Sequence, residues 1–141
     1  MTGYNENTRI GHNTEVRVIT ILSKLGKCGP VFTNKGSPDL FFEPNLLYTK
    51  FIYSSYGVEV KSVKTFTGGK IGRIRINKEP WAKLLEWCVA ANSRPLLIVE
   101  IRGRMKPIYI KIEGDKITDR FRKAGSVSLT IWEVIRLGEK L

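Results

Sequence analysis

The chain has 141 residues, and its 24 lysines and arginines against 13 aspartates and glutamates give a formal net charge of +11. This length suits one domain, residues 1–141, with a single core, and a hydrophobic content of 42% excludes a largely disordered chain. So large a positive excess predicts a polyanionic partner, foremost nucleic acid. The alternative is a basic protein whose charge serves only solubility.

Several other classes are excluded. The longest apolar run, residues 96–101, is short and contains Glu100, so no membrane span is expected, and the N-terminus has no apolar signal core. Cys28 and Cys88 are far apart in sequence, which argues against zinc binding and against a disulfide scaffold. His12 is the only histidine, so chemistry that needs two histidines is excluded. We therefore expect a cytoplasmic protein that does not contact a membrane.

The first predicted elements are an arm and a helix. Residues 1–12 read as a polar, basic N-terminal arm, and Asn13 is expected to cap a helix that runs to about Leu25. The apolar stripe of this helix comprises Val18, Ile19 and Leu22. Glu15 lies on the same face, where an ionised group is unusual. Considered alone, Glu15 is better explained by stabilisation at the positive N-terminal end of the helix.

Strands and two further helices are expected after this point. The expected strands are residues 30–33, 39–42, 58–63, 71–76, 96–102 and 107–112, the last two forming a hairpin around Gly103. Asn77 is expected to cap a helix whose buried stripe is Trp81, Leu84, Leu85 and Cys88. Ser128 is expected to cap a terminal helix that contains Ile131, Trp132 and Ile135. This order predicts an α/β single domain with a mixed central sheet flanked by helices.

Two acids and a lysine carry the candidate chemistry. In the strand 58–63, Val58 and Val60 face one side while Glu59 and Lys61 share the other. If the strand after Asp39 pairs close by, Asp39 and Glu59 converge beside the lysine. Carboxylates held together favour a hard cation such as Mg2+, and the lysine can orient water or stabilise charge on a phosphate. An ion pair between Glu59 and Lys61 on a solvated face is the alternative.

A family resemblance joins these residues. Ser37-Pro38-Asp39 followed by Val58-Glu59-Val60-Lys61-Ser62 resembles the motif of the PD-(D/E)XK nuclease superfamily. The chain as a whole looks most like the archaeal-type Holliday junction resolvases. The segments that look similar to that family are the helix with Glu15, Ile74-Arg75-Ile76, Leu84-Leu85-Glu86-Trp87 and the closing helix 131–137.

The resemblance implies a restriction-endonuclease-like fold and an endonuclease that cuts four-way DNA junctions as a homodimer. It implies that the acidic residues around Mg2+, for which Mn2+ can substitute, are Glu15, Asp39 and Glu59. The backbone carbonyl of Val60 would be a further ligand and Lys61 the catalytic lysine. Ser37 is a loose counterpart of a serine-bearing loop in the family. The chain departs from the family pattern between the two motif acids, where residues 44–56 are inserted.

Basic residues are concentrated after the motif, since residues 61–76 contain no acid. The candidate DNA-contacting residues are Ser37, Lys64, Lys70, Arg73, Arg75, Arg102 and Arg104. Arg73 and Arg75 share a strand face, and glycines at 68, 69 and 72 are expected to allow close backbone approach. An ordinary solvated surface is the alternative. Trp132 and Ile135 are candidates for a dimer contact, or equally for the core.

Two other functions remain open from the sequence. The same fold can serve a nuclease with another DNA target, of the restriction or repair kind. Alternatively, the chain is a non-catalytic nucleic-acid-binding module in which Glu59 and Lys61 merely pair.

Overall fold

The computed structural model describes residues 6–31, 38–45, 47 and 50–141. The helices in this part of the chain are α1 (Glu6–Leu22), α2 (Lys78–Ala90), α3 (Gly114–Phe121) and α4 (Ile131–Leu137). The first strands are β1 (Gly26–Pro30), β2 (Leu40–Pro44), β3 (Tyr56–Lys64), β4 (Phe66–Thr67) and β5 (Lys70–Ile71). The later strands are β6 (Arg73–Asn77), β7 (Arg94–Arg102), β8 (Ile108–Glu113), β9 (Ser126–Thr130) and β10 (Glu139–Lys140). No helix within these residues has the length and apolar content needed to span a membrane.

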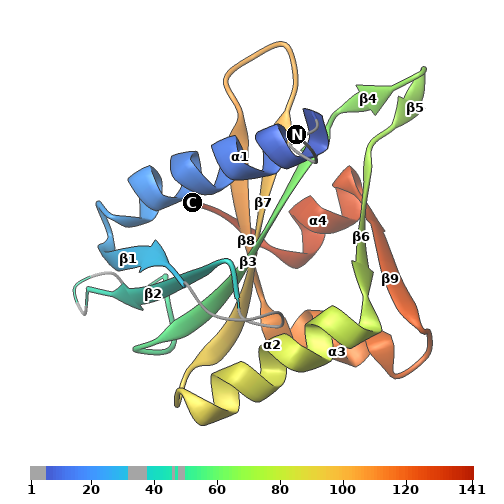
Figure 1. Cartoon of the computed structure of the whole chain (residues 1–141). Coiled ribbons are helices and arrows are strands. Elements are labelled where there is room, and N and C mark those ends of the chain that lie inside the picture. The colour runs from blue at the N-terminus through green and yellow to red at the C-terminus, as the bar shows by residue number, and fades with distance from the viewer. Residues whose placement is uncertain (1–5, 32–37, 46, 48–49) are drawn as a thin grey trace, which may run out of the picture.

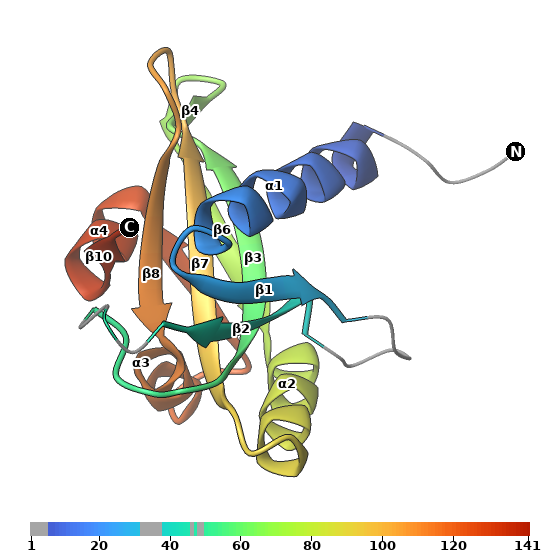
Figure 2. The same ribbon diagram turned by 90° about the vertical axis from the view of Figure 1, so that its left-hand side faces the viewer.

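A six-stranded sheet in the order β1-β2-β3-β7-β8-β10 forms the centre of the domain (Figures 1 and 2). β3 and β7 run parallel over nine residue pairs, whereas the other neighbours in this sheet are antiparallel. Residues 95–101 of β7 are all buried, as expected for a strand covered on both faces. The predicted mixed α/β domain is confirmed.

Each face of the sheet is covered by a different set of elements. Val18 and Leu22 of α1 pack on one face against Phe42, Tyr56 and Leu96. The other face is covered by α2, α3, α4 and the antiparallel pair of β6 and β9. Figure 1 shows the sheet nearly edge-on with these layers on its two sides. The β3 side chains therefore alternate between the α1 side and the α2 side.

The hairpin of β4 and β5 projects from the end of β3 (Figure 1). Its two-residue turn consists of Gly68 and Gly69, which both have positive φ, as a type I′ turn requires. A Cβ added at either position would meet no atom, so these glycines serve the turn and not a close approach. Gly72 does allow a close approach, because a Cβ there would overlap the carbonyl oxygen of Lys64.

The first helix begins earlier than the sequence predicts. α1 starts at Glu6, so the expected N-cap at Asn13 is wrong and residues 6–12 are helical instead of forming an arm. Residues 1–5 of the expected arm lie outside the described residues. The first strand spans Gly26–Pro30 and pairs antiparallel with β2, so it overlaps the expected strand 30–33 only at Pro30. Val31 is not in a strand, and residues 32 and 33 lie outside the described residues.

The terminal helix is capped by Thr130 and not by Ser128. Ser128 lies within β9, opposite Arg75 of β6. The Thr130 side chain accepts a hydrogen bond from the Glu133 backbone, and the Glu133 side chain accepts one from the Thr130 backbone. This reciprocal capping box satisfies two backbone N–H groups at the start of α4. The sequence pattern predicts neither of the short elements α3 and β10.

Candidate active site

The candidate site lies where β3 continues beyond the end of β2. The paired residues are Leu40 with Val58, Phe41 with Gly57 and Phe42 with Tyr56, so the rest of β3 has no β2 partner at this edge. Asp39 stands just before β2 at this fork. Its Oδ2 accepts a hydrogen bond of 2.8 Å from the backbone N–H of Val60. The carboxylate thus satisfies a strand N–H that would otherwise lack a partner, and the bond fixes Asp39 against the middle of β3.

Glu59 and Lys61 leave β3 on the side opposite to Val58 and Val60. Their charged ends form an ion pair, with Nζ of Lys61 3.7 Å from Oε1 of Glu59. The Glu59 side chain is 26% exposed and that of Lys61 36%, so both remain within reach of solvent. The predicted placement of this pair on one strand face agrees with the geometry.

Glu15 reaches the same place from α1. Its carboxyl lies near enough to Asp39 and Glu59 to interact electrostatically with both. Three acids that are 20 or more residues apart in sequence therefore meet at one edge of β3. Ser37, the loop residue named with them, lies outside the described residues.

Burial and mutual repulsion raise the pKa values of these carboxyls above their ordinary range. Burial, followed by the charge of Asp39, raises the pKa of Glu15 to about 7. Burial and the charges of Asp39 and Glu15 likewise raise the pKa of Glu59 to about 7, against the opposing charge of Lys61. Burial also raises the pKa of Asp39, although the Val60 N–H and Lys61 oppose this. Near neutral pH, the site therefore holds protons that a cation would displace.

The donor set suits a hard divalent cation in its chemistry. All the candidate ligands are oxygen atoms, which Mg2+ prefers, and they include carboxyls whose repulsion such a cation relieves. In the described residues, however, no group of three or more His, Cys, Asp or Glu side chains is arranged to hold a metal ion as it stands.

Glu100 of β7 anchors the helix that carries Glu15. This carboxylate is fully buried and accepts bonds from Arg17 at 2.7 and 2.9 Å and from Thr14 at 3.1 Å, both on α1. Ser62 of β3 and Tyr109 of β8 donate further bonds to it at 3.0 and 2.7 Å. Glu15 lies between the two α1 donors in sequence, so its position is fixed by this network.

The same network determines the charge of Glu100. Burial alone would raise its pKa, but the hydrogen bonds from Arg17, Tyr109 and Ser62 outweigh burial and lower the pKa to about 2. In the sequence, Glu100 is visible only as an interruption of an apolar run. That interruption was itself the signal, since a buried carboxylate requires partners.

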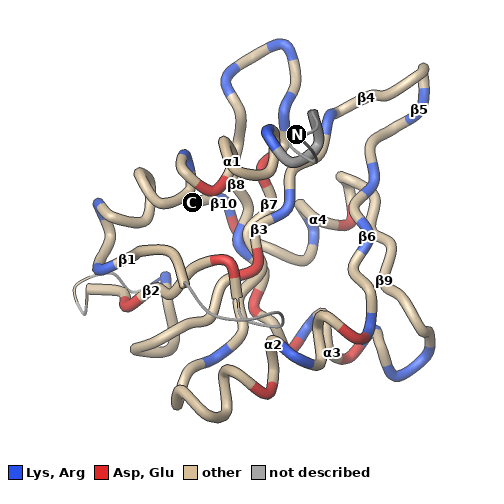
Figure 3. Tube along the Cα trace, in the orientation of Figure 1, with Lys and Arg blue, Asp and Glu red and all other residues tan. Residues whose placement is uncertain are grey.

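The candidate DNA-contacting residues fall into two groups. Arg73 and Arg75 are exposed on β6 while Ile74 and Ile76 are buried, as the alternation predicts. These arginines donate to Ser128 and Ser126 of β9 at 3.1 and 3.5 Å. The other group, at the far end of β3 and the turn after β7, consists of Lys64, Arg102 and Arg104. Lys70 is exposed on β5, at the hairpin turn. Figure 3 shows lysines and arginines on the turn between β7 and β8, at β5 and on β6, and acids near β3.

Comparison with known proteins identifies the fold. No protein-family model matches the chain, and no curated protein matches it in sequence. Among solved structures, the fold is similar to that of Archaeoglobus fulgidus Hjc, a Holliday junction resolvase from an archaeal hyperthermophile, with a TM-score of 0.64. The match covers 93% of this chain and 91% of that chain at 13% sequence identity. The chain therefore shares the fold of that resolvase.

Proposed function

We propose that this protein is a metal-dependent endonuclease that hydrolyses phosphodiester bonds in DNA. The observation that supports this function is the meeting of Glu15, Asp39 and Glu59 with Lys61 at the open edge of β3. The net charge of +11 favours a polyanionic substrate. Similarity in fold to a Holliday junction resolvase adds to this support.

The chain's own groups have distinct roles in this proposal. Glu15, Asp39 and Glu59, with the Val60 backbone carbonyl, would hold Mg2+, for which Mn2+ can substitute. When bound, such an ion supplies Lewis acidity toward water and phosphate. The Val60 N–H keeps Asp39 turned toward the site. Lys61 places a compact positive charge where negative charge develops on the phosphate, and its ion pair with Glu59 holds it there.

The proposed substrate is a four-way DNA junction, cut by a homodimer. A two-fold dimer presents two equivalent sites, which suits a branched substrate with two equivalent strands. Trp132 and Ile135 of α4, left undecided between core and dimer contact, are 66% and 40% exposed. They are therefore candidates for an apolar contact between subunits. The sedimentation coefficient of the purified chain measures whether the dimer exists.

A cleavage assay tests the enzymatic function. Four-way junction, duplex and single-stranded DNA of related sequence are incubated with the protein, with Mg2+ or with EDTA. We expect cutting of the junction that requires Mg2+, and loss of cutting with retained binding in Asp39→Asn. The matched control is Glu43→Gln, an exposed carboxylate on β2 that should leave cutting unchanged. Normal cutting by Asp39→Asn would show that the assigned site is wrong.

A non-catalytic nucleic-acid-binding module is the second candidate. The ion pair between Glu59 and Lys61, and the lack of a ready metal-ligand group among the described residues, favour it. Its signature in the same assay is binding of all substrates without cutting under any metal condition. Cutting of duplex DNA in preference to the junction would instead indicate a restriction-like or repair-like target.

A further inference from the structure

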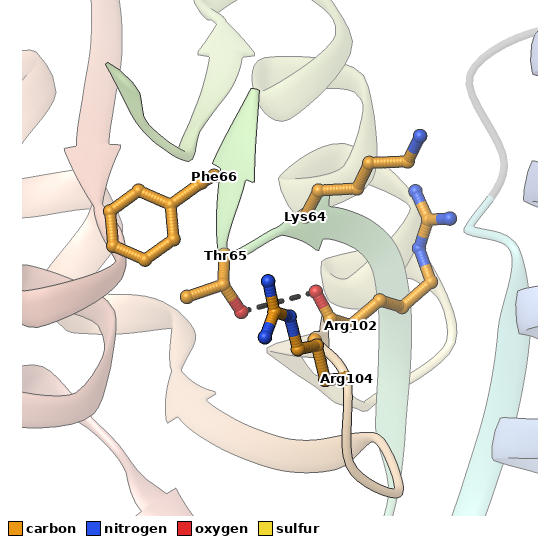
Figure 4. Close-up of a pocket in the computed structure, with 6 residues that line it drawn as sticks. Lys64, Thr65, Phe66, Arg102 and Arg104 are labelled. Atoms are coloured by element: carbon orange, nitrogen blue, oxygen red, sulfur yellow. Dashed lines mark hydrogen bonds between the residues drawn. The ribbon is translucent and has the colours of Figure 1, made fainter. Parts of the chain in front are cut away.

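A hollow of about 570 Å³ lies between the end of β3 and the turn that joins β7 to β8. It is lined by Lys64, Thr65, Phe66, Arg102, Gly103 and Arg104. Figure 4 shows the Phe66 ring on one side of Thr65, and the Lys64 and Arg102 side chains on the other. An aromatic face and a group of cations thus border one space.

The walls of this hollow are held together by the backbone. The Thr65 backbone N–H and its hydroxyl donate to the Arg102 carbonyl at 2.9 and 3.1 Å, and the Gly72 N–H donates to the Thr65 carbonyl at 2.8 Å. A Cβ added at Gly103 would lie 2.9 Å from the Thr65 hydroxyl, so only glycine lets the turn come this close. The hollow is therefore formed before any ligand arrives, which lowers the entropic cost of binding.

The lining has the chemistry of a nucleotide site. Phe66 is 63% exposed, although a large aromatic side chain is usually buried. Within the described part of the chain, Lys64 and Arg104 have no carboxylate partner. Arg102 donates from its Nε to Ser62 at 2.8 Å, and the same atom lies 3.9 Å from Oε1 of Glu100. No acid lines the hollow. Three cations around an exposed ring fit a ligand with negative charge and a flat apolar face.

The hollow lies further along β3 than the candidate catalytic residues. Lys64 follows Glu59 by five residues on β3, which places it roughly 17 Å further along the strand. Lys64 is an odd number of residues from both Glu59 and Lys61, so it faces the other side of β3, and the hollow is a contact surface separate from the acidic site. Bases in a duplex are stacked on each other, so an aromatic ring can receive a base only where pairing is interrupted.

We propose that Phe66 stacks on an unpaired nucleobase of the DNA, while Lys64, Arg102 and Arg104 bind the phosphates on either side of it. This proposal rests on the proposed action on DNA and specifies which part of the substrate is recognised. It makes the hairpin of β4 and β5 the element that distinguishes branched or single-stranded DNA from continuous duplex.

A binding assay in EDTA tests the stacking site without cleavage. The probes are a single strand with one 2-aminopurine, whose fluorescence falls when it stacks, and the fully paired duplex of the same sequence. We expect Phe66→Ala to bind the single strand roughly five- to 100-fold more weakly, from the range for base–aromatic stacking. Phe66→Leu should show a similar loss, since it keeps apolar volume but lacks the ring. Duplex affinity should not change.

The control is Val89→Ala on α2, an apolar side chain that is 83% exposed and distant in the fold. Unchanged single-strand affinity in Phe66→Ala, equal losses on both probes, or no fall in fluorescence on binding to the unaltered protein would each overturn the stacking site. If the protein stacks the base but does not cut DNA, the proposed nuclease activity is wrong and the stacking site stands. If it cuts DNA without stacking the base, the stacking site is wrong and the nuclease activity stands.

Discussion

Raising the pH from 5 to 8 without divalent ions should destabilise the folded protein through its acidic site. Glu15 and Glu59 have pKa values of about 7 in the folded state, against 4.5 ordinarily. The folded chain therefore binds more protons than the unfolded chain between these two values. Because of this excess, the free energy of unfolding falls as the pH rises through that window.

The size of the effect follows from the pKa shift. One pKa unit corresponds to about 1.4 kcal/mol. A single carboxyl whose pKa is raised this far therefore lowers the free energy of unfolding by about 3 kcal/mol at the upper end of the window. Asp39 contributes to both shifts, so the effects of Glu15 and Glu59 do not simply add. We expect a total loss of about 3 kcal/mol. The lowered pKa of Glu100 acts only in more acidic solution, outside this range.

Denaturant unfolding at a series of pH values in EDTA measures this loss. The double variant Glu15→Gln and Glu59→Gln should remove most of the pH dependence, while Glu43→Gln, exposed on β2, should keep it. Added Mg2+ should stabilise the protein more at pH 8 than at pH 5, because an ion competes with protons for the same oxygens. A stability that is flat or rises from pH 5 to 8 in EDTA would refute the crowded carboxyl cluster.

Two further predictions concern the elements that support the site. Arg17→Ala should lower the free energy of unfolding by about 3 kcal/mol, because it removes the main cation from the buried carboxylate of Glu100. Arg122→Ala, which breaks an exposed ion pair, should cost less than about 1 kcal/mol in the same denaturation experiment, and equal losses would contradict the anchoring role. Thr130→Ala should cost about 1 kcal/mol through loss of the helix cap, as measured by thermal unfolding. Ser128→Ala should cost less, and the reverse order would contradict the capping box.

The central strand and its acids could be predicted because their signals are local. The alternation of Val58 and Val60 with Glu59 and Lys61 fixes which side chains share a face of β3. The turn residues before Asp39 indicate a strand start, and antiparallel pairing then brings Asp39 opposite Glu59. These inferences need only the two-residue period of a strand and one correct pairing.

The remaining features depend on contacts that a local pattern does not contain. The bonds of Glu100 join residues 38 to 86 positions away in the chain, apart from the neighbouring Tyr109. The start of α1 was missed because Asn13 is a good capping residue, yet such a preference does not prevent a helix from beginning earlier. The cap at Thr130 can be predicted from the sequence, because Glu133 three residues later completes the capping-box pattern.

The direction of β2 and β3 explains how a long connection is accommodated between Asp39 and Glu59. The strands are antiparallel, so the chain leaves β2 at Pro44 and enters β3 at Tyr56, at the opposite end of the pair from Asp39. Residues added to this connection lengthen the distance along the chain but leave the spatial separation of Asp39 and Glu59 unchanged. Related sequences can therefore vary freely in length here, and a search for them should not require a fixed spacing between the acids.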